Sequence, residues 1–86
     1  MPDRSFVDTN VLVYTDDGDA PAKQEASLAL FERLRRERSG VVSTQVLQEY
    51  FVAATRKLGV DEALARRKVQ LFGGLDVVVL DVGQVL

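Results

Sequence analysis

The sequence predicts an α/β fold in which helices flank a parallel sheet. Short apolar runs near residues 6–14, 41–42 and 77–80 are rich in Val, Leu and aromatic residues, as buried strands are. Between these runs, apolar residues recur at helical spacing. Strands that alternate with helices are typical of a parallel sheet with right-handed crossovers. The chain has 86 residues, which predicts one domain spanning residues 1–86, with about three strands.

The composition limits the chemistry that this chain can perform. Hydrophobic residues make up 47% and charged residues 28%, so a folded core is expected and a disordered tail is excluded. There is no Cys and no His, which excludes disulfides, zinc thiolate sites and a histidine base. A net charge of -2 excludes a strong global field for polyanions. Catalysis or binding must therefore use carboxylates, hydroxyls, amides or basic groups.

The N-terminal segment and the apolar runs also predict the location of the protein. No run approaches the roughly 18 apolar residues of a membrane span. Asp3 stands where a secretory signal would carry basic residues. We therefore expect a cytoplasmic protein with no membrane association.

The first apolar run is interrupted by polar residues. Phe6 and Val7 precede the polar residues 8–10, and the apolar segment 11–14 follows. Its β-branched and aromatic content predicts a buried strand that turns near the interruption. A short loop or helix is expected over residues 16–19.

Pro21 marks the start of the first long helix, because its missing N–H costs nothing in a first turn. The helix is expected over residues 22–38, with Ser39 and Gly40 ending it by supplying a residue that tolerates positive φ. The apolar residues at helical spacing in this segment are Ala26, Leu30, Phe31 and Leu34.

A second strand is expected at Val41 and Val42, followed by a helix capped by Ser43 or Thr44. This helix has a wide apolar stripe and ends at Gly59. The stripe consists of Val46, Leu47, Tyr50, Phe51, Ala54 and Leu58. We interpret the two aromatic residues of the stripe as core residues.

Asp61 is expected to open another helix, and the glycine pair 73–74 to end it. Its predicted buried side consists of Leu64, Leu71, Phe72 and Leu75, and its predicted outer side of Arg66, Arg67 and Lys68. Asp76 precedes an apolar strand over residues 77–80. Asp81 and Gln84 then have the spacing of a capping box, which indicates the beginning of a further helix. We therefore expect the 86 residues to be the first part of a longer α/β unit.

Two polar clusters follow the first two predicted strands, where ligands bind in open α/β sheets. The clusters are residues 8–10 and 43–49. Asp8 in an apolar segment is costly unless it is paired, hydrogen-bonded or bound to a cation. Glu49 lies on the side of its helix away from the apolar stripe. Two carboxylates without His or Cys suit a hard cation such as Mg²⁺ or Mn²⁺. Spacing alone favours a simpler interpretation, in which Asp8 caps a turn and Glu49 is solvated.

Both clusters resemble a known family. Residues 6–14, FVDTNVLVY, look like the first strand of PIN-domain ribonucleases, and residues 43–51, STQVLQEYF, resemble the next recognisable block of that family. The order of helices and strands is also similar to that of the VapC-type toxins of bacterial toxin–antitoxin pairs.

The resemblance implies roles for individual residues. Asp8 would be the first metal-binding acid and Glu49 the second. Thr9 and Asn10 would order the loop around Asp8. Ser43 or Thr44 would hydrogen-bond a metal-bound water or an RNA phosphate.

The resemblance further implies a three-layer PIN-like fold, Mg²⁺-dependent (or Mn²⁺-dependent) cleavage of RNA, an antitoxin partner and a homodimer. The family brings further acids from helices after the third strand, and this sequence ends before them. We interpret Asp81 as a helix cap and expect a PIN-like domain truncated before its C-terminal helices and strands. The first strand would be central in that family, so here it would present an unpaired apolar edge. By themselves these residues should be a poor nuclease.

Two other functions are compatible with the sequence. One is a catalytically inactive PIN-like interaction module that binds an antitoxin or a second copy. The other is a phosphatase of the haloacid dehalogenase type, which ranks lower because Asn10 replaces the second Asp of the Asp-x-Asp motif. The clusters of basic residues are interpreted as solvated helix faces, although some could contact RNA phosphates. These are residues 33–38, 56–57 and 66–68.

Overall fold

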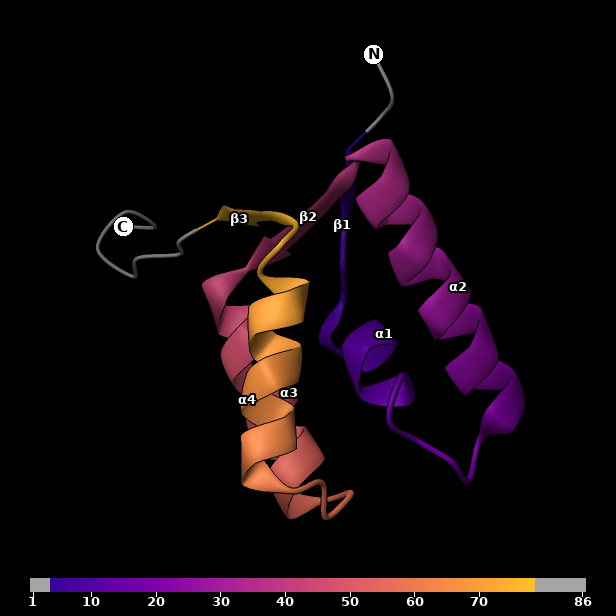
Figure 1. Cartoon of the computed structure of the whole chain (residues 1–86), viewed down its shortest axis with the longest axis vertical. Helices are drawn as coiled ribbons and strands as arrows, with labels where there is room; N and C mark the ends of the chain where they lie inside the picture. Colours follow the sequence, from indigo (N-terminus) through magenta and orange to yellow (C-terminus); the bar gives the residue numbers. More distant parts are fainter. Residues whose placement is uncertain (1–3, 79–86) are drawn as a thin grey trace.

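The computed structural model describes residues 4–78, which form an α/β fold of three parallel strands and four helices (Figure 1). The fold class predicted from the sequence is confirmed at this level. The elements in chain order are β1 (Ser5–Phe6), α1 (Thr9–Tyr14), α2 (Pro21–Glu37), β2 (Gly40–Ser43), α3 (Thr44–Arg56), α4 (Glu62–Phe72) and β3 (Asp76–Val78). The strands occupy the upper half of Figure 1, and α1, α3 and α4 lie below them.

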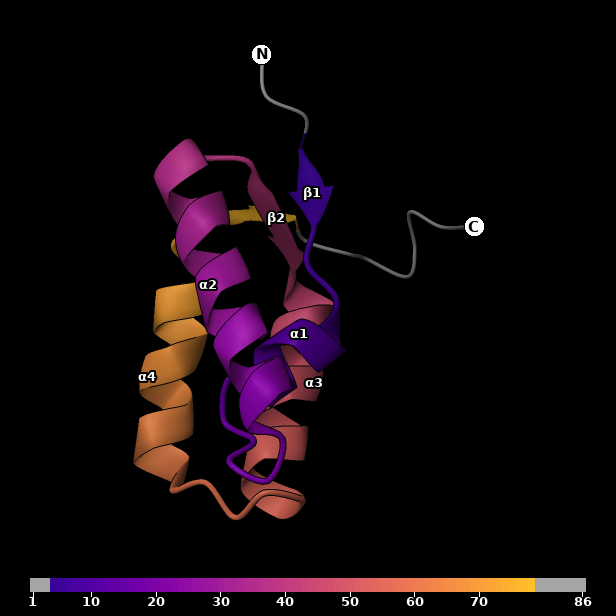
Figure 2. The ribbon, with the colours of Figure 1, turned by 90° about the vertical axis from the view of Figure 1, so that its right-hand side faces the viewer.

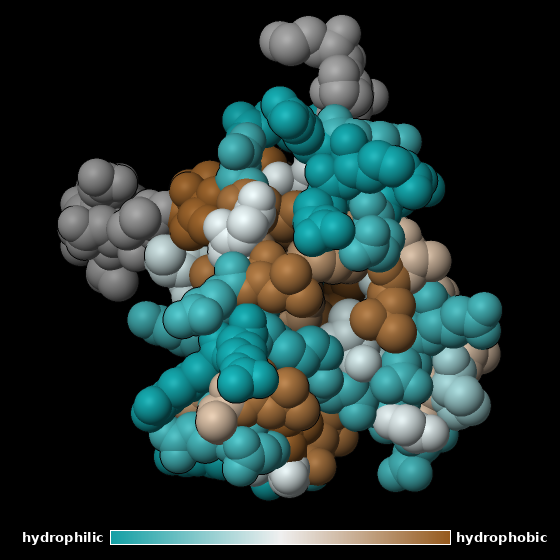
Figure 3. All heavy atoms as spheres, viewed as in Figure 1, coloured by the Kyte–Doolittle hydropathy of each residue, from teal (hydrophilic) through white to brown (hydrophobic). Residues whose placement is uncertain are grey.

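The sheet has the strand order β1-β2-β3, with every pair parallel. Ser5 pairs with Gly40, and Val42 pairs with Val77. The central strand β2 is buried, whereas both residues of β1 are exposed and Phe6 is 77% exposed. The predicted apolar edge at the first strand is therefore confirmed, but the prediction that this strand is buried is wrong. The opposite edge is apolar too, and Figure 3 shows hydrophobic atoms over β3.

Three aromatic rings join the long helices beneath the sheet. Phe72 of α4 packs edge-on against Phe31 of α2 and Tyr50 of α3, with ring centroids 5.1 and 5.0 Å apart. Such edge-to-face pairs add about 1 kcal/mol each beyond the area that they bury. Figure 2 views the molecule from the side on which α2 lies. The buried cluster also contains Val7, Leu12, Leu34, Val42, Ala54, Ala65 and Leu75.

The segment after the first strand is a helix, so the predicted strand over residues 11–14 is wrong. Asp8 ends the extended segment and caps α1 by accepting a hydrogen bond from the backbone N–H of Asn10. Leu12 is then completely buried between α2 and α3. The β-propensity of Val11 and Val13 is a weak preference, and burial of the helix against its neighbours outweighs it.

Helix α2 begins at Pro21 as predicted, but it ends differently. The residue with positive φ is Arg38, at 55°, and neither Ser39 nor Gly40. Gly40 is needed for another reason, because a Cβ there would lie 3.0 Å from a methyl of Leu75. The predicted buried side is correct for Phe31 and Leu34 and wrong for Ala26, which is exposed.

Helix α3 follows its prediction closely. Ser43 caps it by accepting a hydrogen bond from the N–H of Val46, and Tyr50 and Ala54 are buried. Gly59 follows the helix with φ of 66°, a conformation that glycine adopts without strain.

Helix α4 is capped by Asp61 as predicted, and its predicted buried side is correct for Phe72 and Leu75 but wrong for the two other leucines. Leu64 and Leu71 are about half exposed, whereas Ala65 is fully buried. The buried stripe runs through Ala65, Lys68 and Phe72, at spacings of three and four residues. Because this stripe contains a lysine, the sequence pattern did not indicate it and predicted Lys68 on the outer side of the helix.

The predicted end of the last strand, at residues 79–80, and the predicted helix start at Asp81 and Gln84 lie outside the described residues. Within residues 4–78, every helix is too short or too polar to span a bilayer.

Candidate functional site

The two sequence clusters meet at one edge of the sheet. Asp8 follows β1 and caps α1, and Ser43 ends β2 and caps α3. Because β1 and β2 are parallel neighbours, both helices begin at the carboxyl edge of the sheet. Helices α1 and α3 then pack against each other.

Asp8 is exposed, and one of its oxygens is already used. Its Oδ1 accepts the N–H of Asn10 at 3.1 Å. Asp8 therefore is a capping residue, as the simpler interpretation predicted. Its Oδ2 accepts no hydrogen bond from the described residues and stays available to a ligand.

Glu49 is exposed, as predicted, and both of its oxygens are held in place. Oε2 accepts a hydrogen bond from Thr9 Oγ1 at 2.8 Å, and Oε1 accepts one from Gln45 Nε2 at 3.1 Å. The Thr9 contact crosses 40 residues of sequence and ties the start of α1 to α3. Thr9 thus orients Glu49, whereas the sequence analysis expected it to order the loop around Asp8.

The other supporting residues also have defined places. The backbone N–H of Asn10 donates to the Asp8 side chain, and Asn10 is also among the residues that line a hollow described below. The Ser43 hydroxyl accepts from Val46 N–H at 3.0 Å, and Thr44 is the first residue of α3. Both lie at the carboxyl edge of the sheet, where α3 begins.

The charge at this edge is not neutralised. No Lys or Arg among residues 4–78 has a nitrogen within 4.0 Å of Asp8 or Glu49. Two carboxylates without a basic partner create a negative local potential that favours a cation. The carboxylate atoms that could bind a metal here are oxygens, which Mg²⁺ prefers as ligands. The described residues contain no cluster of three or more acidic, His or Cys side chains, so a cation bound here would keep several waters.

A hollow of about 450 Å³ opens between α1 and α3, beside Glu49. We call it the α1–α3 hollow. Asp8 is not part of its lining. The hollow is lined by Thr9, Asn10, Val13, Gln48, Glu49, Val52, Ala53 and Lys57.

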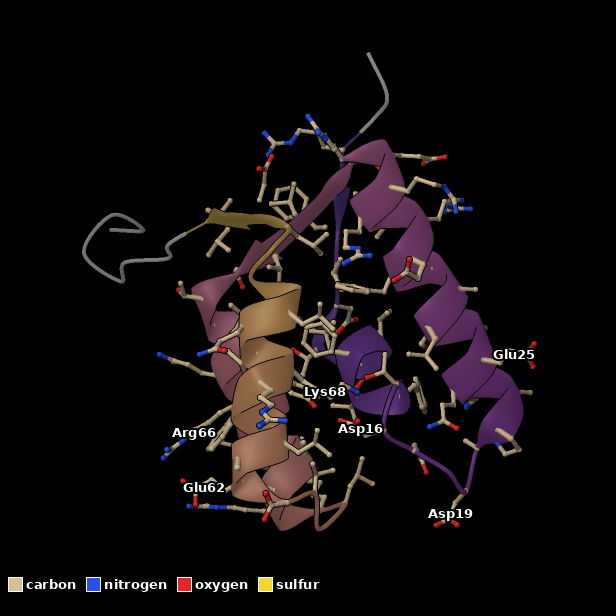
Figure 4. The ribbon with its side chains drawn as sticks, in the orientation of Figure 1. Asp16, Asp19, Glu25, Glu62, Arg66 and Lys68 are labelled. Atoms are coloured by element: carbon tan, nitrogen blue, oxygen red, sulfur yellow. The ribbon has the colours of Figure 1, made fainter. Side chains whose placement is uncertain are left out.

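A second polar group lies inside the molecule and was not anticipated from the sequence. Lys68 of α4 reaches across to Asp16, which follows α1, and forms an ion pair with it (Figure 4). Lys68 also donates to Thr15 Oγ1 at 2.9 Å, and the hydroxyl of Tyr50 donates to Asp16. The side chains of Lys68 and Asp16 are only 18% and 10% exposed. We call Thr15, Asp16, Tyr50 and Lys68 the interior cluster.

Burial, together with the hydrogen bond to Asp16 and its negative charge, raises the pKa of the Tyr50 phenol far above its ordinary value. The members are linked by hydrogen bonds to one another, and the Thr15 hydroxyl also donates to the Leu12 carbonyl, so the cluster ties α3 and α4 to the end of α1. The sequence did contain one sign of it. Lys68 lies three residues after Ala65 and four before Phe72, so a helical stripe through the two apolar residues includes it.

Comparisons of this chain with models of protein families, with curated proteins and with solved structures found no match. The functional argument therefore depends on the residues and the geometry described above.

Proposed function

We propose that this chain belongs to a Mg²⁺-dependent endoribonuclease of the PIN type, a toxin of a toxin–antitoxin pair, in which Asp8 and Glu49 bind the metal. The observation that supports this most strongly is the hydrogen bond from Thr9 to Glu49. It joins the two sequence blocks on which the resemblance is based, at the edge of the sheet where α/β proteins bind ligands. An unneutralised pair of carboxylates is the second support.

The residues of this chain have separate tasks in the proposed reaction. Asp8 Oδ2 and a Glu49 oxygen provide two oxygen ligands. Thr9 and Gln45 hold Glu49 in one orientation. Bound Mg²⁺ supplies an activated water and stabilises the negative charge of the phosphoryl transition state. Ser43 and Thr44 would contact a phosphate or a water at the same edge.

The test is RNA cleavage by the natural polypeptide that contains these residues. Asp8→Asn and Glu49→Gln should each lower Mg²⁺-dependent cleavage by at least about a hundredfold, because each removes a charged ligand. Asp8→Asn should fold normally, since Asn caps helices as well as Asp.

The matched controls are Asp19→Asn and Glu25→Gln, which remove exposed acids elsewhere; Figure 4 shows both side chains pointing into solvent. They should leave cleavage unchanged. Full Mg²⁺-dependent cleavage by both site variants would refute the proposed metal ligands.

A second candidate is an inactive module that binds an antitoxin or another copy of the chain. It is favoured by an apolar groove of about 620 Å³ between α3 and α4, where Leu47, Phe51 and Val69 line the wall. Exposed grooves of this kind are common at protein interfaces. Sedimentation analysis distinguishes the two candidates together with the cleavage assay, because a self-associating chain without metal-dependent cleavage would support the module.

A further inference from the structure

The α1–α3 hollow has the size of a small-ligand site. Its volume of about 450 Å³ lies within the usual range for pockets that hold small molecules, roughly 300–1,000 Å³. Glu49, a proposed metal ligand, forms one part of its wall. A group seated in the hollow would therefore lie next to the proposed metal.

On the α3 side of the hollow, a small residue stands between two long ones. Glu49, Ala53 and Lys57 follow one another at intervals of four residues, so they form a single row on the surface of α3. The methyl group of Ala53 leaves an open space between the two charged side chains. At 1.5 Å per residue, Glu49 and Lys57 begin about 12 Å apart along the helix.

Three polar side chains around this space have no partner within the described part of the chain. The amides of Asn10 and Gln48 and the ammonium of Lys57 make no hydrogen bond or ion pair with residues 4–78. Each amide offers donors and an acceptor in one plane, as the edges of nucleic-acid bases do. The ammonium of Lys57 suits a phosphate.

We call the aliphatic part of the lining the floor of the hollow. Val13 of α1 and Val52 and Ala53 of α3 line it. Aliphatic side chains can contact the flat face of a base and bury part of its apolar surface. The lining thus combines aliphatic side chains, two amides and the ammonium of Lys57, whose Cα lies about 12 Å along the helix from that of Glu49.

We propose that the α1–α3 hollow binds one unpaired RNA nucleotide adjacent to the scissile phosphate. Its base lies on the aliphatic floor with its edge toward Asn10 and Gln48, and its outer phosphate contacts Lys57. This inference rests on the proposed ribonuclease function, because Glu49 then places the metal and the scissile phosphate at the near end.

The direct test is nucleotide binding followed by NMR, with the full natural chain labelled with ¹⁵N. The common ribonucleoside 5′-monophosphates are titrated in the presence of EDTA, so that neither metal nor cleavage is needed. At least one nucleotide should shift the side-chain amide signals of Asn10 and Gln48 in a saturable manner. Gln70, which lines the groove between α3 and α4, is the internal control and should not shift.

Two substitutions locate the binding within the hollow. Lys57→Gln should weaken nucleotide binding by about tenfold, the usual effect of losing a charged hydrogen bond. Its neighbour Arg56 is not among the lining residues, so Arg56→Gln should change binding by less than about twofold. Ala53→Leu should fill the hollow and abolish binding, and leucine is well tolerated in helices.

Absence of any shift at Asn10 and Gln48 with all nucleotides would overturn the subsite. The subsite would also be overturned if Lys57→Gln and Arg56→Gln weakened nucleotide binding equally. The proposed ribonuclease function fails by a different result, which is the absence of Mg²⁺-dependent RNA cleavage by the unmodified natural chain. Because Asp8 does not line the hollow, Asp8→Asn should leave nucleotide binding in EDTA unchanged.

Discussion

Carboxylates at two places in the molecule are in opposite electrostatic situations. In the interior cluster, Asp16 has Lys68 and the Tyr50 hydroxyl as partners and is almost completely buried. At the sheet edge, Asp8 and Glu49 are exposed and have only neutral partners. The first arrangement is complete without a ligand, whereas the second leaves a negative charge that a cation would balance.

This difference distinguishes charged groups that stabilise the fold from charged groups that can bind a ligand. A buried charge must be paired, and so its pair is explained by stability alone. An exposed carboxylate needs no partner for stability. Two hydrogen bonds nevertheless orient Glu49, and the one from Thr9 also ties α1 to α3, so that the exposed carboxylate is held in a fixed position that suits a ligand.

The largest expected effect on stability concerns the interior ion pair. Lys68→Met should lower the free energy of unfolding by about 3 kcal/mol, because it leaves Asp16 buried without its cation. Urea denaturation measures the change. The double variant Asp16→Asn/Lys68→Met should recover part of the loss, since no charge is then left unpaired.

The matched control is Arg66→Met on the same helix. Arg66 pairs with Glu62 at 2.7 Å, but Figure 4 shows both side chains on the outer side of α4. Exposed pairs of this kind contribute less than about 0.5 kcal/mol. Equal losses for Lys68→Met and Arg66→Met would contradict the contrast between interior and surface.

The next largest effect is expected from Tyr50→Phe, which keeps the ring in the core and removes its hydroxyl. Loss of a hydrogen bond to a charged group should cost about 2 kcal/mol. Denaturation at neutral pH tests this value, and an unchanged free energy of unfolding would show that the hydroxyl contributes nothing.

The same residue predicts a dependence on alkaline pH. The pKa of Tyr50 is raised above its ordinary value of 10.0, so the folded protein favours the neutral phenol. Its contribution is therefore complete below pH 10.0 and is lost as the pH rises further. The phenolate absorbance of Tyr50 should appear only with unfolding, and Tyr50→Phe should remove this part of the pH dependence.

A smaller effect is expected at the sheet edge when metal is added. Mg²⁺ at about five times its Kd should raise the free energy of unfolding by about 1 kcal/mol, because it binds only the folded chain. Glu49→Gln should abolish this increase and leave the stability in EDTA nearly unchanged. An equal response of Glu49→Gln and the unmodified chain to Mg²⁺ would exclude Glu49 as a ligand.

The smallest change in stability should come from Thr9→Val. The substitution removes one exposed hydrogen bond and should alter the free energy of unfolding by less than about 0.5 kcal/mol. Mg²⁺ affinity should nevertheless fall by roughly tenfold, as happens when a residue that orients a ligand is lost. Calorimetric titration of Mg²⁺ measures this affinity, and an unchanged value would mean that Thr9 does not position Glu49.

Local signals in the sequence determined much of the fold. Pro21, Ser43 and Asp61 mark helix starts because capping and proline geometry depend on a few neighbouring residues. The stripe of α3 and the exposure of Glu49 followed from helical periodicity alone. The positions of Asp8 and Ser43 after neighbouring parallel strands followed from the alternation of strands and helices.

Only the tertiary structure decided the features that depend on contacts between distant residues. Residues 11–14 became helix α1 because burial of Leu12 outweighed local β-propensity. Lys68 turned inward because Asp16, 52 residues earlier, offers it a partner. Thr9 turned to Glu49 across 40 residues in the same way. Such energies belong to pairs of residues that the fold brings together, and no segment of the sequence contains them by itself.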